Sequence, residues 1–488
     1  MATEAAGAVA TPGRLQRRAL SLGAANAFDY GVQFLLPIVL VRCLDPEAFG
    51  EYRLLWLAAG TVMAVVTQSM AGSLYYFLPR STAALKRLYI NQVLLFLAAC
   101  GLIGAWAVSA WNPWLPVQMQ VLGRHGFVVP AFVMLWVVAS LLDLLPTIEE
   151  RVAWQTRATI GLATLRAGAL SLTAFLTHAL EPVLAVLLGV VAFKVLLLSG
   201  YVARYHGLGR PLLERSAFAD QWRHAAPFGI AGALYGLRAQ ADQWVAAALF
   251  SVGMFAAFSI AAVLGPLVNL FRQSVIQAFL PGMSRLQAAG DVHGMLRLNS
   301  RANALVAALV FPLLAYIFVF AEEVVSLVYT AAYASGAPVM RVYIAGLAAL
   351  TIELVTIMLL LRQGGFAMRV NAIVLPCSVG CSWLLASQFG LAGAAAGSVI
   401  AVYLDVGATL HRIARRTGIE VRRLQDWQAL GRSALCAICA ATLTWLVAGR
   451  ECGAAAPVSC LALGATVMAA SYGALHALFG PRVRNLGA

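Results

Sequence analysis

Charged side chains occur inside stretches of this sequence that are otherwise long and apolar. A charge at the centre of a lipid bilayer costs at least ~3 kcal/mol on insertion scales, so each of these residues needs a partner or an aqueous lining. Arginines in such places are typical ligands of phosphate and carboxylate groups, and carboxylates are typical partners of cations. The residues are Asp29, Arg53, Arg166, Lys194, Arg238, Asp242, Arg272, Glu353 and Asp405.

Neutral polar residues accompany these charges at helical spacing. In the first apolar stretch, Asn26, Tyr30 and Gln33 stand at positions i, i+4 and i+7 of a helix, with Asp29 beside them. A helix face exposed to lipid would not tolerate this pattern, so the face must meet protein or a water-filled cavity. Together with the family resemblance given below, which implies a central cavity lined by the helices that carry them, the polar faces make these residues the candidate substrate-binding lining: Asp29, Tyr30, Gln33, Arg53, Arg238, Asp242, Asn269, Arg272 and Gln273.

Several of these charges have a second interpretation. Arg238 and Asp242 are four residues apart and could form a structural pair within one helix. Arg272 has no acid within one turn, which favours an anion-binding role over a side chain that extends to the membrane surface. Interhelical pairing is favoured for Arg166, Lys194, Glu353 and Asp405, although Glu353 or Asp405 could instead carry a coupling proton or sodium ion.

The elements that must position these residues are membrane-spanning helices. About 20 apolar residues in a helix cross the hydrocarbon core of a bilayer, and 61% of the 488 residues are hydrophobic while 11% are charged. The predicted fold is therefore an all-α integral membrane protein with about 14 spans. We place them at 18–41, 53–78, 88–111, 127–147, 157–178, 182–204, 223–250, 253–280, 301–320, 338–361, 366–388, 391–412, 429–449 and 456–479.

The net charge of +14 comes from basic residues that are concentrated in alternate loops. Such an asymmetry is the mark of cytoplasmic loops, and it predicts a multi-pass protein of the bacterial inner membrane with both termini in the cytoplasm. It also explains the basic charge without a nucleic-acid partner. The two largest basic segments, 205–222 and 413–428, are predicted to be cytoplasmic linkers.

The chain shows a weak internal repeat, in which the connection after the first span is similar to the connection after the seventh. Two units of six spans each would share one orientation and be related by an axis along the membrane normal. We therefore expect two pseudo-symmetric six-helix lobes around a central cavity, residues 1–210 and 211–415, followed by a linker and an extra helix pair, residues 416–488.

Sequence signals for an enzyme are weak. The chain contains no phosphate-binding loop with its lysine, no HExxH or GxSxG motif and no acidic pair for a metal. Cys436 and Cys439 lie in an apolar stretch, where cysteine acts as a small hydrophobe. Cys452 and Cys460 flank the last outer loop, where a disulfide could form. We expect no catalytic residues, no metal and no cofactor.

Five local patterns, in a fixed order, give the chain a family resemblance. Residues 42–52 read Arg-Cys-Leu-Asp-Pro-Glu-Ala-Phe-Gly-Glu-Tyr, and Asp242 precedes an apolar run that ends in Phe-Ser-Ile-Ala at 258–261. The other three are Gln-Ala-Phe-Leu-Pro at 277–281, Phe-Pro at 311–312 followed by Ala-Glu-Glu-Val-Val-Ser-Leu-Val-Tyr at 321–329, and Gly-Leu-Ala-Gly-Ala-Ala at 390–395. Together they resemble the Wzx-like polysaccharide flippase branch of the multidrug/oligosaccharidyl-lipid/polysaccharide exporter superfamily.

This resemblance implies a transporter that moves a polyprenyl-diphosphate-linked oligosaccharide across the inner membrane by alternating access. Its expected partners are that lipid-linked oligosaccharide, membrane lipids, a polysaccharide polymerase and glycosyltransferases. An ion-coupled multidrug exporter of the same superfamily is the alternative, but a site for cationic drugs should be acidic, whereas Arg53, Arg238 and Arg272 make this one basic. A glycan polymerase would need reactive side chains in a large outer loop, and the sequence has none.

Overall fold

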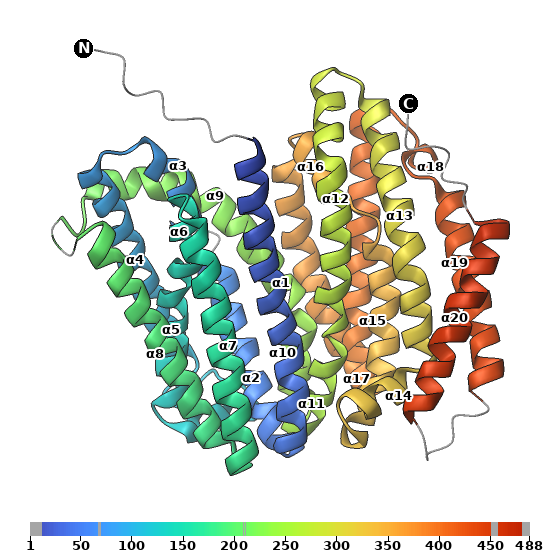
Figure 1. The fold of residues 1–488 in the computed structure, drawn as a ribbon, viewed down its shortest axis with the longest axis horizontal. Helices are drawn as coiled ribbons and strands as arrows, with labels where there is room; N and C mark the ends of the chain where they lie inside the picture. Colours follow the sequence, from blue (N-terminus) through green and yellow to red (C-terminus); the bar gives the residue numbers. More distant parts are fainter. Residues whose placement is uncertain (1–11, 67–69, 208, 210, 450–456, 481–488) are drawn as a thin grey trace. The chain divides into compact units, whose positions relative to one another are not determined.

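The structure is a computed structural model that describes residues 12–66, 70–207, 209, 211–449 and 457–480. Within these ranges the regular secondary structure is helical, and twelve helices are long and apolar enough to cross a membrane. The chain divides into two compact units, residues 1–236 and 237–488 (Figure 1). The expected all-α membrane fold is thus confirmed.

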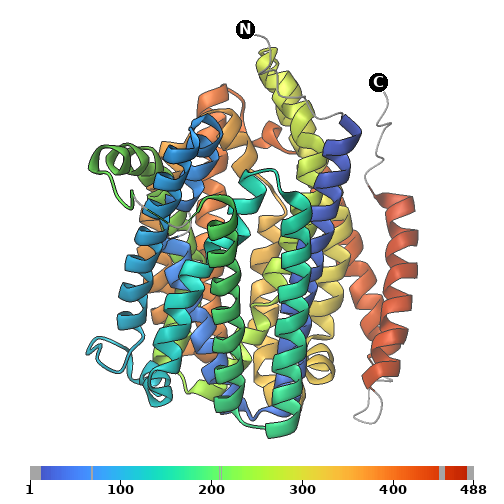
Figure 2. The same ribbon diagram turned by 60° about the vertical axis from the view of Figure 1, so that its left-hand side comes forward.

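Unit 1 is built from long helices that the apolar pattern predicts, with short helical segments between them. In Figures 1 and 2, α1 and α7 run side by side along much of their length. The helices are α1 (Pro12–Cys43), α2 (Pro46–Val66), α3 (Met70–Phe77), α4 (Ala83–Ala107), α5 (Val128–Ala139), α6 (Leu145–Ile148), α7 (Val152–Thr177), α8 (Leu180–Tyr205) and α9 (Arg215–Ala239), and α9 continues past the end of the unit.

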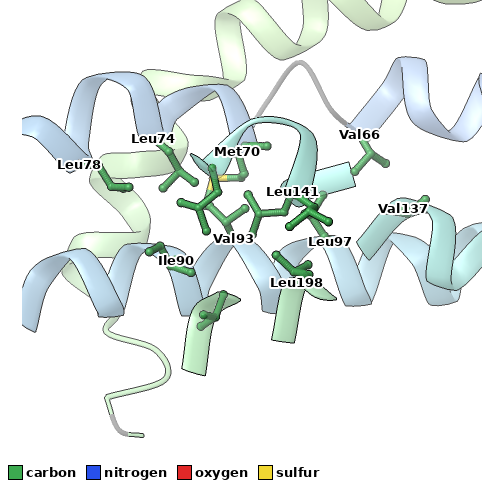
Figure 3. Packing of buried hydrophobic residues seen from close by; sticks show 14 of the residues in the cluster. Val66, Met70, Leu74, Leu78, Ile90, Val93, Leu97, Val137, Leu141 and Leu198 are labelled. Carbon is green, nitrogen blue, oxygen red and sulfur yellow. The ribbon is translucent and has the colours of Figure 1, made fainter. Parts of the chain in front are cut away.

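A large apolar cluster holds the helices of unit 1 together (Figure 3). Met70 and Leu74 of α3 meet Ile90 and Val93 of α4, and Leu141 reaches the same cluster from the segment after α5. Burying one such side chain contributes about 1.5–3 kcal/mol relative to leaving it exposed. This packing fixes the frame against which the polar residues of α1, α2 and α7 are held.

Unit 2 contains the second set of long helices and the C-terminal pair. Its elements are α10 (Ala241–Leu249), α11 (Val252–Ala261), α12 (Leu264–Ala288), α13 (Val292–Val319), α14 (Ala321–Val328), α15 (Ala337–Leu350), α16 (Val355–Leu360), α17 (Gly364–Thr417), α18 (Val421–Leu424), α19 (Trp427–Ala448) and α20 (Pro457–Phe479).

The helix labelled α17 contains two of the predicted spans, because the chain turns back within it. Gly390 has φ 61° and ψ −143°, a conformation that only glycine adopts at little cost. A side-chain carbon added at Gly393 would collide with the carbonyl oxygen of Leu385, and one at Gly397 would collide with the backbone of Ser382. The GxxxG spacing therefore allows the two arms of α17 to pack closely.

The predicted span 223–250 is divided into two helices. Its first part belongs to α9 and its second part is α10, and Gln240 between them has left the helical conformation. This break changes which charged residues can meet, as described below.

The C-terminal helices α19 and α20 pack on each other and on α13, within unit 2 (Figure 2). The hydroxyl of Tyr316 donates to the carbonyl of Leu461 at 2.7 Å, and the hydroxyl of Tyr472 donates to the carbonyl of Ala308 at 2.8 Å. Cys460 at the start of α20 is disulfide-bonded. Cys452, which was expected as its partner, lies outside the described residues.

Candidate functional site

The polar stripe of α1 meets a cation from another helix of unit 1. Arg166 of α7 donates from Nη2 to Oδ1 of Asp29 at 2.8 Å, and Gln33 donates from Nε2 to Oδ2 of the same carboxylate at 2.7 Å. The interhelical pairing expected for Arg166 is present, and Asp29 is its counter-ion. Tyr30, on the same stripe, is exposed.

A pocket of about 170 Å³ lies among α1, α2, α5 and α7, entirely within unit 1. Arg53, which belongs to the predicted substrate-binding set, and Arg166, which was predicted only to pair across helices, contribute its cationic groups. Its described lining includes no carboxylate. The lining residues are Gln33, Leu36, Pro37, Tyr52, Arg53, Trp56, Trp136 and Arg166.

Pro37 removes one backbone hydrogen bond of α1 next to this pocket. Pro37 lies inside α1 and has no amide hydrogen, so it cannot donate to the carbonyl of Gln33 four residues earlier. Both residues line the pocket. The Gln33 carbonyl therefore has no amide donor four residues later in α1.

Aromatic rings form a second wall that the sequence did not single out. Trp56 of α2 and Trp136 of α5 stand at 88° to each other with ring centroids 5.0 Å apart, and Phe132 stacks on Trp136 at 5.7 Å. Trp136 also lies 5.2 Å below Nζ of Lys194, which pairs with Asp143 at 2.7 Å. Trp136 falls in the middle of a uniformly apolar stretch, so no local pattern marks it.

In unit 2 the expected pair between Arg238 and Asp242 is not formed, and that interpretation was wrong. Arg238 instead pairs with Asp405 on α17, with Nη2 and Oδ2 3.0 Å apart. The reason is the break at Gln240: the two residues lie on α9 and α10 rather than one turn apart on a single helix. The pairing expected for Asp405 across helices is present.

Asp242 is buried, with only 3% of its surface exposed. Its carboxylate accepts hydrogen bonds from the hydroxyl of Tyr343 at 2.7 Å, the hydroxyl of Ser398 at 2.6 Å and the backbone amide of Gln243 at 2.8 Å. It also lies in the first turn of α10, where the helix dipole favours a negative charge. In this conformation Asp242 joins α10, α15 and α17.

Arg272 of α12 has an acidic partner that sequence spacing could not reveal. Its Nη1 lies 2.6 Å from Oε2 of Glu353, and its Nη2 donates to Oδ1 of Asn269 at 2.7 Å. Glu353 is 81 positions further along the chain, in the non-helical segment between α15 and α16. Gln273, the next residue, is exposed.

A buried polar network positions Glu353. Asn299 of α13 donates to the backbone carbonyl of Glu353 at 3.1 Å, and Asn303 accepts from its backbone amide at 3.1 Å. Gln425 completes the network with hydrogen bonds to both asparagines. Side chains that hold a non-helical segment are well suited to keep the Glu353 carboxylate beside Arg272.

The predicted residues therefore fall into two groups, one in each unit. Unit 1 contains Asp29, Gln33 and Arg53 together with Arg166, and unit 2 contains the pairs Arg238–Asp405 and Arg272–Glu353. In each pair an arginine is held by a carboxylate, which a phosphate or another anion could replace as its partner. The described residues hold no cluster of histidine, cysteine or acidic side chains suited to a metal ion.

Comparison of the sequence with known protein families identifies the family of this chain. The model of the lipid II flippase MurJ family matches residues 158–465, well over half of the chain. The chain belongs to the MurJ family. Because members of this family are flippases, this MurJ-family protein is a transporter and not an enzyme, as the sequence predicted.

Solved structures share the fold of this MurJ-family protein at low sequence identity. A lipid II flippase MurJ in an inward closed conformation has a TM-score of 0.69 and 12% identity, covering 94% of this chain and 98% of that one. An inward-facing multidrug resistance MATE family transporter of the MOP superfamily has a TM-score of 0.61 and 13% identity, covering 80% and 95%. A MOP superfamily transporter from Pyrococcus furiosus has a TM-score of 0.50 and 12% identity, covering 82% and 96%. No curated protein matches the sequence.

Proposed function

We propose that this protein flips a polyprenyl-diphosphate-linked oligosaccharide from the cytoplasmic to the outer leaflet of the bacterial inner membrane. The oligosaccharide would feed exopolysaccharide or surface polysaccharide synthesis, with a polymerase and glycosyltransferases as partners. Membership of a flippase family is the observation that carries the proposal. Transport would proceed by alternating access of two six-helix lobes around a central cavity, with the extra pair α19 and α20 beside them.

Arg272 is the residue that we assign to the diphosphate. Its guanidinium already binds an anionic oxygen, that of Glu353, at 2.6 Å. A diphosphate offers the same charge and several oxygens to a planar donor fork, so it can replace the carboxylate without leaving the arginine unpaired. Arg238, paired with Asp405, is assigned a supporting role of the same kind.

The same exchange suggests how an ion could be coupled to transport. If the diphosphate takes Arg272, the carboxylate of Glu353 loses its cation, although only 7% of its side chain is exposed. A lone buried charge is costly, so Glu353 would then bind a proton or a sodium ion. Asp405 would do so if Arg238 were taken.

Two observations bear on the head group. The family match begins at residue 158, so α1 and α2, which line the pocket of unit 1, lie outside the matched range. The head-group preference of the family therefore does not transfer to that lining. The sequence patterns in 42–52 and 242–261 resemble polysaccharide flippases, which supports an oligosaccharide rather than lipid II.

The proposed orientation places both termini in the cytoplasm, because basic residues are concentrated in the loops on that side. The disulfide at Cys460 supports the same orientation. Disulfides persist in oxidising compartments, and this orientation puts the loop before α20 outside the cytoplasm.

Deletion of the gene tests the proposal in cells. We expect the lipid-linked oligosaccharide to accumulate with its head group in the cytoplasmic leaflet, and surface polysaccharide to disappear. Wild-type protein and the surface variant Arg341→Gln should restore export, whereas Arg272→Gln should not. If lipid II accumulates instead, the oligosaccharide assignment is wrong; if neither lipid accumulates, the flippase assignment to this protein is wrong.

A further inference from the structure

The pocket of unit 1 combines cationic and aromatic side chains in one lining. It is bounded by α1, α2, α5 and α7, and its volume is about 170 Å³, which is room for one small group. Its chemistry therefore bears on what one small ring-shaped group would meet there.

The polar groups of the pocket are mainly hydrogen-bond donors. Arg53 and Arg166 line it. Among the described residues, Arg166 forms one ion pair, from its Nη2 to Asp29. One buried donor of a lining residue, Nε of Arg166, has no hydrogen-bond acceptor among the described residues. A carboxylate in the pocket would meet the guanidinium groups of Arg53 and Arg166, which are strong partners of an anionic oxygen.

The apolar part of the lining is aromatic. Trp56 and Trp136 line the pocket with their rings nearly at right angles, and Tyr52 lies against Trp56 with ring centroids 6.2 Å apart. The negative face of an indole attracts the polarised C–H bonds of a sugar ring. A phosphate group gains nothing from such a wall, so the aromatic rings indicate a sugar.

Acceptors for sugar hydroxyls are also present, though fewer. The carbonyl of Gln33 lacks an amide partner because Pro37 occupies the fourth position after it. A hydroxyl on a sugar ring can donate to this oxygen. The lining thus offers cations for an acid, ring faces for a pyranose and one acceptor for a hydroxyl.

We infer that this pocket binds one acidic sugar residue of the transported head group, a pyranose ring that carries a carboxylate. The carboxylate would be held by Arg53 and Arg166, and the ring would lie against Trp56 and Trp136. The inference rests on the proposed function and refines it, because it assigns the pocket to the sugar and not to the diphosphate. It requires at least one acidic residue in the oligosaccharide.

Binding of small probes to the purified full-length protein in detergent tests this directly. Saturation-transfer NMR with glucuronate, glucose and inorganic pyrophosphate would show which of the three binds. We expect glucuronate to bind, glucose to bind at least tenfold more weakly, and pyrophosphate not to displace glucuronate. A charge-assisted hydrogen bond contributes about 1.5–3 kcal/mol, which corresponds to roughly 10–150-fold in affinity.

Matched variants locate the binding. Arg53→Gln and Trp136→Leu should each weaken glucuronate binding about tenfold or more, and Arg53→Lys should weaken it less than Arg53→Gln. Arg80→Gln is the control, since Arg80 lies over Tyr76 away from the pocket and its loss should change nothing. Elution of each variant as a monodisperse peak in gel filtration would confirm folding.

The outcomes separate this inference from the proposed function. Equal binding of glucose, displacement by pyrophosphate, or unchanged glucuronate binding in the folded Arg53→Gln and Trp136→Leu variants would each overturn the acidic-sugar assignment. A protein that flips a lipid-linked oligosaccharide but binds no glucuronate would overturn the pocket assignment alone. A protein that binds glucuronate as expected but flips no lipid would overturn the flippase proposal while leaving the sugar site in place.

Discussion

The pair Arg272–Glu353 gives the sharpest prediction, because Arg272 is assigned to the substrate and Glu353 to holding Arg272 until the substrate arrives. The side chains are 16% and 7% exposed, and the charged atoms are 2.6 Å apart. Removing one member of a buried pair costs about 3–5 kcal/mol, since the other charge is left unpaired. Glu353→Gln should lie near the lower end, ~3 kcal/mol, because Arg272 keeps its bond to Asn269.

The double variant Arg272→Gln/Glu353→Gln should recover most of that loss. Neutralising both members leaves no unpaired charge, so we expect an interaction energy of about 2–3 kcal/mol between the two substitutions. Unfolding in mixed detergent–SDS micelles measures it. The control cycle uses the exposed pair Arg341–Glu322, at 3.1 Å, for which surface pairs predict about 0–1 kcal/mol.

Transport by the same variants separates structure from function. If Glu353 only holds Arg272, Glu353→Gln should retain export in proportion to its folded protein, and if Glu353 also carries the coupling ion, the folded variant should lose export; the stable double variant should export nothing in either case. Export by the double variant at the wild-type level would refute the assignment of Arg272. Additive losses of stability would refute the pairing.

Three further predictions follow from single contacts. In a cysteine-free background, a cysteine at Arg215 should react only with reagents that reach the cytoplasm and one at Glu323 should react from outside, and the reverse pattern would reject the orientation. Membrane abundance should fall for Arg238→Gln and recover when Asp405→Asn is added, whereas no recovery would show that the two charges do not compensate each other. Burial tends to raise the pKa of Glu149, but His206, Tyr201 and Arg151 together hold this pKa below the ordinary 4.5. The ionised Glu149 therefore stabilises the folded protein above pH 4.5, and this stabilisation is lost as the pH falls further. Glu149→Gln should destabilise the protein at pH 7 and make no difference in stronger acid.

The membrane-spanning helices could be predicted from the sequence because the free energy of transferring a helix into lipid is the sum of contributions from its own residues. The long apolar stretches that form α4, α8 and α13 needed no knowledge of their neighbours. The close packing at Gly393 and Gly397 likewise depends on a local feature of the sequence, the absence of a side chain at both positions.

Contacts between distant segments could not be predicted in the same way. Spacing suggested that Arg238 would meet Asp242, but the break at Gln240 depends on packing and carries no proline or glycine signal. Glu353 reaches Arg272 from a non-helical segment held by side chains of another helix. The aromatic wall at Trp136 becomes visible only when four helices are assembled.

Flipping by the purified protein tests the central claim most directly. Proteoliposomes would carry a fluorescent polyprenyl-diphosphate oligosaccharide, and loss of fluorescence to a membrane-impermeant quencher would report the exposed leaflet. With wild-type protein we predict that the fraction of lipid protected in the inner leaflet falls well below that of protein-free liposomes. With Arg272→Gln the protected fraction should equal that of protein-free liposomes. Wild-type vesicles that protect as much lipid as protein-free ones, across proton and sodium gradients of either direction, would contradict the account.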